Sequence, residues 1–138
     1  MEKLDDHVRT RFYPHQQAQE LKEFKGFPSQ IRYNEVLISQ GVEHLVKHYD
    51  AKWIIERYKK LMANRRYPKL LSSRFLTHEL ISAPMFDIFR LVITDGQEVI
   101  YERKYEHIPI RNPSFVMYSV GGFFMLPTEY ESYSQVNP

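Results

Sequence analysis

The sequence predicts an α+β fold in which N-terminal helices pack on a C-terminal antiparallel β-meander of about four strands. Apolar residues recur at helical spacing in much of the N-terminal half. After Pro84 the chain becomes rich in β-branched and aromatic residues, and two glycine-containing turns divide it. Helices first and strands later are typical of the α+β class.

Three amphipathic helices are predicted in the N-terminal half, at residues 15–25, 41–49 and 51–63. In each of them apolar residues are spaced so that they share one helix face. Ser39 and Asp50 precede the second and third helices, and their side chains suit the N-cap position. These two helices are expected to pack as a bent pair.

The segments around these helices give weaker patterns. Residues 31–38 favour a short extended segment. No element is predicted for residues 64–84, because apolar residues and turn formers are mixed there. Trp53 falls on the apolar stripe of the third helix, so we expect it to be buried against the C-terminal sheet.

Two β-hairpins are predicted in the C-terminal half. The first has MFDIFRLVI as one strand and residues 98–107 as the other, joined by Asp95-Gly96, a pair favoured in type I′ turns. Its return strand would place Tyr101 and Tyr105 on one face. The second hairpin has SFVMYSV and FFML on either side of Gly121-Gly122.

Length and composition indicate one soluble domain covering residues 1–138, with a loose arm at 1–12 and a flexible tail at 131–138. The 138 residues are 43% hydrophobic, which excludes a disordered chain. The absence of cysteine excludes disulfides, thiolate metal sites and a cysteine nucleophile. With neither an apolar signal segment nor a membrane-length apolar run, we expect a cytoplasmic protein that does not bind membranes.

Charge is unevenly distributed along the chain. The formal net charge is only +2, but residues 57–74 contain seven basic residues and no Asp or Glu. The rest of the chain is therefore net acidic. This basic stretch is the clearest electrostatic feature of the sequence.

The sequence offers no arrangement typical of catalysis or of metal binding. His44 and His48 have the i, i+4 spacing of a metal pair, but their helix face points away from the apolar stripe and no third ligand is apparent. His78-Glu79 are adjacent on the chain, so their side chains should diverge. Gly121-Gly122 lacks the spacing of a phosphate loop. We expect no catalytic residues, no metal and no cofactor.

The basic stretch has three interpretations: a solvated loop, a surface for an acidic protein, or a surface for RNA or single-stranded DNA. Aromatic residues within it could stack on bases, although Tyr58 and Phe75 fit the core better and only Tyr67 is expected to be exposed. The predicted binding residues are Arg57, Lys59, Lys60, Arg65, Arg66, Tyr67, Lys69 and Arg74.

Several segments together resemble a family of small bacterial and mobile-element proteins that is known only as a domain of unknown function. Its members read roughly LKxFxG, GVxxLxxxxxAxW and LLPxEY, and the resemblance covers about residues 20–130. The matching segments are ELKEFKG, Gly41-Val42, the helix with Trp53, DIFRLVITDG and FFMLPTEY. The basic stretch, by contrast, lies outside the family pattern.

The resemblance implies an order of structural elements and a mobile-element or phage setting, but nothing about chemistry, because no catalytic residues are established for that family. Combined with the basic stretch, it leads us to expect a non-enzymatic accessory protein, such as an inhibitor of a host protein, that binds an anionic partner. A nucleic-acid-binding module is the alternative, because RNA and single-stranded DNA are also anionic.

Overall fold

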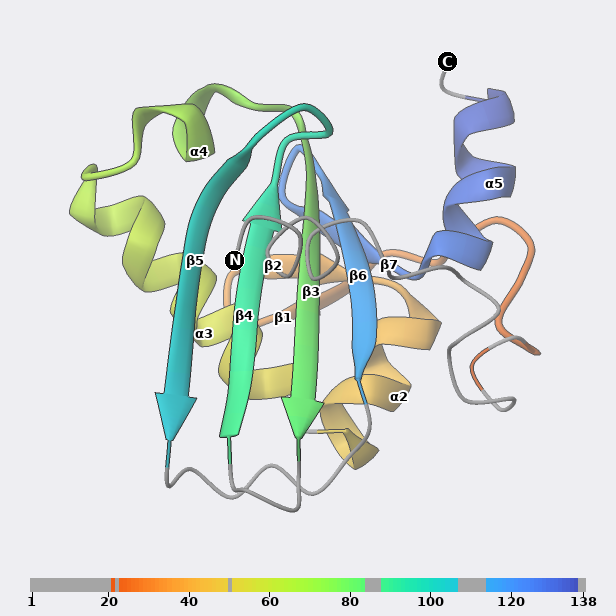
Figure 1. Cartoon of the computed structure of the whole chain (residues 1–138). Helices are drawn as coiled ribbons and strands as arrows, with labels where there is room; N and C mark the ends of the chain where they lie inside the picture. Colours follow the sequence, from red (N-terminus) through yellow and green to blue (C-terminus); the bar gives the residue numbers. More distant parts are fainter. Residues whose placement is uncertain (1–20, 22, 50, 84–87, 107–113, 137–138) are drawn as a thin grey trace.

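The structure, a computed structural model, describes residues 21, 23–49, 51–83, 88–106 and 114–136. It contains a seven-stranded mixed sheet with helices α2 (Gln40–His48) and α3 (Ala51–Asn64) packed on one face (Figure 1). The strands are β1 (Ile31–Tyr33), β2 (Val36–Ile38), β3 (Phe75–Ala83), β4 (Ile88–Thr94), β5 (Val99–Glu106), β6 (Phe115–Val120) and β7 (Phe123–Met125).

The strand order corrects the predicted architecture. The order is β1-β2-β7-β6-β3-β4-β5, and within the described residues β2 and β7 form the one parallel pair. The predicted architecture, in which N-terminal helices pack on a C-terminal antiparallel meander of about four strands, is therefore wrong. Two strands precede the helices, and β3 lies between the hairpins β4–β5 and β6–β7, which the prediction placed side by side.

The two predicted hairpins themselves are confirmed. In the first turn, the Asp95 carboxylate accepts hydrogen bonds from the backbone N–H groups of Gln97 and Glu98, both at 2.9 Å. In the second turn, Gly121 and Gly122 have φ angles of +58° and +85°, a conformation that glycine adopts without strain. These local features were sufficient to predict where the chain turns, but the first turn is not the type I′ turn that Asp95-Gly96 favours, because φ is positive at Gly96 and not at Asp95, and Thr94 pairs with Val99.

Two of the three predicted helices are confirmed as α2 and α3. The Ser39 hydroxyl accepts a hydrogen bond from the Val42 N–H at 3.1 Å and caps α2 as expected. Most of the predicted helix at 15–25, together with Asp50, lies outside the described residues. None of the helices within the described ranges combines the length and the apolar composition needed to cross a bilayer.

Strand β3 fills the middle of the sheet, in the segment for which no element was predicted. Its even positions, Leu76, His78 and Leu80, are buried on the face toward α3, and the intervening positions face the other side. A histidine in the middle of an otherwise apolar face interrupts the alternation that would have indicated a strand. The strand is nevertheless stabilised by hydrogen-bonded neighbours on both sides, β4 and β6.

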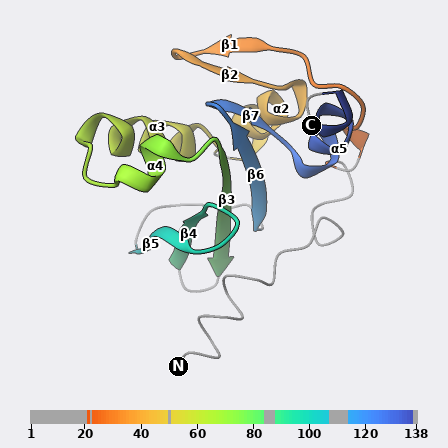
Figure 2. The same cartoon turned by 90° about the horizontal axis from the view of Figure 1, so that it is seen from above.

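The sheet curls around α2 and α3, so that β1–β2 and β4–β5 lie on opposite sides of α3 (Figure 2). As a result, side chains from both ends of the sheet join one core. Ile31 and Val36 from the first hairpin pack against the same buried cluster as Leu91 and Tyr101 from the other end. Aromatic residues contribute much of this core, as the composition indicated.

A second apolar cluster lies on the opposite face, beneath α5 (Pro127–Val136). Val120, Phe123 and Met125 are buried there, and Tyr130 and Tyr133 of α5 pack against them. Helix α5 occupies most of the segment that the sequence suggested as a tail. It packs on β6 and β7, which lie in the middle of the strand order (Figure 1).

Trp53 packs on the C-terminal half of the sheet, as predicted. Its ring meets Phe89 and Tyr105 edge to face, with centroid distances of 5.2 and 4.8 Å. The ring is half-buried rather than enclosed. The Arg57 guanidinium lies 5.4 Å from the ring centroid.

We expect Trp53→Ala to lower the free energy of unfolding by about 3 kcal/mol, at the lower end of the range for large aromatic residues because the ring is half-buried. Urea unfolding followed by circular dichroism measures this loss. The exposed neighbour Lys52 provides the control, since Lys52→Ala should change stability by less than about 0.5 kcal/mol. Equal stability of the two variants would contradict the core assignment.

A buried carboxylate joins the start of α2 to the start of α5. Glu129 is fully buried and accepts hydrogen bonds from the Ser39 hydroxyl at 2.5 Å, the Gly41 N–H at 3.0 Å and the Leu126 N–H at 2.9 Å. One side chain therefore satisfies otherwise unpaired donors at two helix N-termini. Burial raises the pKa of Glu129, and the hydrogen bonds from Ser39, Leu126 and Gly41 oppose that rise.

This junction leaves no space for a side chain at residue 41. A Cβ atom on Gly41 would lie 2.6 Å from a methyl carbon of Leu126 and 2.8 Å from the Glu129 carboxylate. Nearby, the Thr128 hydroxyl donates a hydrogen bond to the carbonyl oxygen of Phe24 at 2.6 Å. Three segments distant in sequence thus meet at the beginning of α5.

Candidate functional site

The basic stretch runs along the second half of α3, through α4 (Pro68–Ser72) and into the start of β3. Three of its seven cations are engaged by neighbours. Arg57 lies over the rings of Trp53 and Tyr105, at 5.4 and 5.7 Å. Lys59 forms an ion pair with Glu35 at 3.3 Å, and Lys69 pairs with Glu98.

The other four cations are exposed, and their side chains form no ion pair or hydrogen bond with any residue that the structure describes. We call these the four exposed cations: Lys60, Arg65, Arg66 and Arg74. They come from the end of α3, the loop after it and the residue before β3. The structure thus brings part of the predicted binding set to the surface in a form that is available to a partner.

The aromatic residues of the basic stretch are occupied by packing. Tyr58 is buried between His78 and Phe124, with ring centroids 5.5 and 5.1 Å away. Tyr67 is not fully exposed either: it is half-buried, and its ring meets the Tyr101 ring edge to face at a centroid distance of 5.4 Å. Core placement of Tyr58 is confirmed, whereas exposure of Tyr67 is wrong because α4 folds back toward β5.

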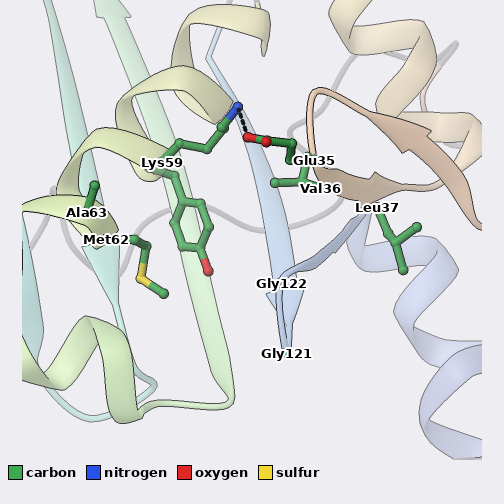
Figure 3. A pocket seen from close by; sticks show the side chains of 9 residues that line it. Glu35, Val36, Leu37, Lys59, Met62, Ala63, Gly121 and Gly122 are labelled. Atoms are coloured by element: carbon green, nitrogen blue, oxygen red, sulfur yellow. Dashed lines mark ion pairs between the residues drawn. The ribbon is translucent and has the colours of Figure 1, made fainter.

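An open cavity of about 540 Å³ lies between α3, the β1–β2 hairpin and the β6–β7 turn. Figure 3 shows Lys59 and Met62 of α3 on one side, the hairpin residues Glu35 and Val36 on the other, and the Gly121–Gly122 turn between them. The Lys59–Glu35 ion pair spans one edge. Much of the lining is apolar, and it comes from segments far apart in the sequence.

A second open cavity, of about 380 Å³, adjoins the first. It shares four lining residues with it: Tyr58, Met62, Gly121 and Gly122. Its other walls come from α4 and the turn after it, namely Leu70, Leu71, Ser72, Ser73 and Arg74. We call the two cavities together the α3 groove.

The α3 groove combines an apolar floor with hydrogen-bond donors. Arg74 supplies a guanidinium group, and Ser72 and Ser73 supply hydroxyl groups. Burial raises the pKa of Tyr58, so its phenol stays neutral and retains a proton to donate. Arg74 is also one of the four exposed cations, which places positive charge at the groove itself.

The sequence contained the cations of this site but not its cavities. Gly121 and Gly122 were correctly interpreted as a turn, yet their place beside Met62 depends on the strand order, which was predicted wrongly. Leu71 lines the second cavity and is 44% exposed, one of few large apolar side chains so exposed in the described part of the chain, and only the folded structure shows this exposure. No signal in the sequence linked Glu35 to α3.

The histidines do not gather into a site within the described residues. The rings of His44 and His48 lie 4.7 Å apart, and His44 also contacts Phe24. Among described residues, no three His, Asp or Glu side chains are placed to hold a metal ion. His107 lies outside the described ranges.

His78 and Glu79 diverge, as expected for neighbours on a strand. His78 points to the α3 side, where its Nε2 lies 2.8 Å from the Ser119 hydroxyl. Burial lowers the pKa of His78 to about 3, so the imidazole is neutral near pH 7. Glu79 instead faces the side of Tyr118, whose pKa is raised by burial first and then by the nearby Tyr130 and Glu79.

Comparison with known proteins gives one family match. The model of a "Family of unknown function (DUF6876)" matches residues 15–130. Neither the curated proteins nor the solved structures give a match. Three of the segments that carried the resemblance contribute to the junction at the start of α5 rather than to the α3 groove. Their residues at this junction are Phe24, Gly41 and Glu129.

Proposed function

Because the chain belongs to this family of unknown function, its own residues must indicate its role, and we propose that it is a non-enzymatic binding protein that engages an acidic protein partner. The observation that carries this proposal is the set of four exposed cations, Lys60, Arg65, Arg66 and Arg74, of which Arg74 also lines an open groove. Exposed charges of one sign attract a partner of the opposite sign and orient it.

An acidic protein is favoured over nucleic acid by the aromatic residues. Binding of single-stranded nucleic acid relies on exposed rings on which bases stack. Tyr58, Tyr67 and Phe75 are instead engaged by other rings of the protein. Lys59 and Lys69 support the proposal as well, since their exposed ion pairs are weak and can be exchanged for a partner's carboxylates.

The resemblance to mobile-element and phage proteins supports a host protein as this partner. Under this proposal the protein acts by occupying an acidic surface of the host protein, so that inhibition requires no chemistry. The mobile-element setting and the inhibition rest on the resemblance, whereas the charge of the partner rests on the exposed cations.

Charge reversal tests the proposal. The variant Lys60→Glu/Arg65→Glu/Arg66→Glu should lose binding to poly-glutamate, measured by fluorescence anisotropy at about 0.15 M salt, while its thermal unfolding stays unchanged. The matched control, Lys25→Glu/Arg32→Glu/Lys52→Glu, changes three other exposed cations and the net charge by the same amount. It should retain most of the binding, because at moderate salt only nearby charges contribute.

Three outcomes would contradict the proposal. Equal losses in the two triple variants would indicate a response to net charge alone. No binding of poly-glutamate by the wild type would exclude an acidic partner. Tighter binding of single-stranded DNA than of poly-glutamate, with a steep dependence on salt, would establish the nucleic-acid alternative instead.

A further inference from the structure

We propose that the α3 groove accepts a large apolar side chain carried by the acidic partner segment, with a neighbouring carboxylate bound at Arg74. This inference rests on the proposed function and adds the chemistry of the contact. Charges alone would attract many anionic surfaces, whereas an apolar anchor in a groove would select among them.

The first part of the argument is the apolar lining. Val36, Met62 and Ala63 line the first cavity, and Leu70 and Leu71 line the second. Leu71 is 44% exposed although it belongs to a helix packed on the core, so an apolar surface is left open to water. A partner side chain that covers such a surface gains about 25 cal/mol for each Å² removed from water.

The second part is the position of the donors. Arg74, Ser72 and Ser73 line the same cavity as Leu71, so a carboxylate can meet a guanidinium group and hydroxyl donors next to the apolar floor. Tyr58 lines both cavities, and its hydroxyl has no hydrogen-bond partner among the described residues. A peptide with an acidic residue near a leucine, methionine or phenylalanine presents such a pair, an apolar group beside a carboxylate.

The third part is the extent of the charge. Lys60, Arg65 and Arg66 lie outside the lining of both cavities. A small molecule held in the groove would leave them uncovered, whereas an extended acidic segment can contact them while its anchor is buried. Charge complementarity beyond the groove therefore favours a peptide segment over a metabolite.

The test measures the binding of three kinds of labelled peptide by fluorescence anisotropy. The first kind is acidic and has Leu, Met or Phe at its centre. The second kind is acidic and has Ser at its centre, and the third keeps the central Leu but has Gln and Asn in place of the acidic residues. We expect the first set to contain the tightest binder, by at least about tenfold over the Ser peptide, because burying such a side chain is worth more than the 1.4 kcal/mol that a tenfold change requires.

Matched variants locate the binding. Leu71→Ser and Arg74→Glu should each weaken the best acidic peptide about tenfold. Val136→Ser removes another exposed apolar residue, on α5, and Lys52→Glu reverses another exposed cation, so both should bind like the wild type. Thermal unfolding of all four variants shows whether they are folded, and these exposed positions should tolerate the changes.

The failure of this inference differs from the failure of the proposed function. If the Leu and Ser peptides bind equally, or if Leu71→Ser binds like Val136→Ser, the groove is not the anchor site, although salt-dependent binding of acidic peptides would still support the function. If no acidic peptide binds, both proposals are overturned. Binding of the neutral Leu peptide as tightly as the acidic one would overturn the role of Arg74.

Discussion

Acidification from about pH 6.5 to about pH 3 should remove about 5 kcal/mol of stability through His78 alone. The imidazole is fully buried, and burial lowers its pKa from 6.5 to about 3. Its Nδ1 has no hydrogen-bond partner among the described residues, so a second ring proton would have no acceptor. The unfolded chain takes up this proton near pH 6.5, and the folded chain does so only near pH 3. Stability is therefore highest above pH 6.5 and falls as the pH decreases through this interval.

The variant His78→Gln isolates this effect from the titration of the carboxylates. Its amide can still reach the Ser119 hydroxyl, but it has no proton to gain in this range. Chemical unfolding at a series of pH values should show a steeper acid loss in the wild type than in the variant. Parallel pH profiles would mean that the imidazole is not the cause.

Loss of the Glu129 carboxylate should lower the free energy of unfolding by about 3 to 5 kcal/mol. Glu129→Ala leaves the N–H groups of Gly41 and Leu126 without their acceptor and takes the same acceptor from the Ser39 hydroxyl. Each buried donor left unsatisfied costs about 1 to 3 kcal/mol, and a cavity adds to that loss. Thermal and urea unfolding measure the effect.

Two further variants show whether the hydrogen bonds are responsible. Glu131→Ala removes an exposed carboxylate of the same helix and should change stability by less than about 0.5 kcal/mol. Glu129→Gln keeps one acceptor oxygen but turns an N–H group toward another N–H, so we expect an intermediate loss. If Glu129→Ala were as stable as Glu131→Ala, the junction would have no structural importance.

Elements specified by neighbouring residues could be predicted from the sequence. The Asp95-Gly96 and Gly121-Gly122 turns fix their hairpins locally, and Ser39 caps α2 through a residue three positions away. Pairing between distant strands has no such local signal. The β2–β7 pair joins Leu37 to Phe123, and neither strand exceeds three residues, which is too short to show a clear alternation.

The same limit applies to the candidate site. The charges of residues 57–74 were visible in the sequence, but their pairing was not. Glu35 and Glu98, which neutralise Lys59 and Lys69, come from the β1–β2 turn and the β4–β5 turn, so only the folded arrangement shows which cations remain. The groove depends on the curl of the sheet in the same way.

The parallel contact between β2 and β7 also determines when the protein can fold as it is synthesised. The N-terminal hairpin leaves the ribosome early, but its neighbour in the sheet is Phe123–Met125, near the other end of the chain. The acceptor for the first N–H groups of α2 is equally late, since it is the side chain of Glu129. A nascent chain therefore holds an uncovered strand edge and an incompletely capped helix until residues 123–129 have left the ribosome. Throughout that interval the unpaired β2 edge is open to chaperones or to other chains.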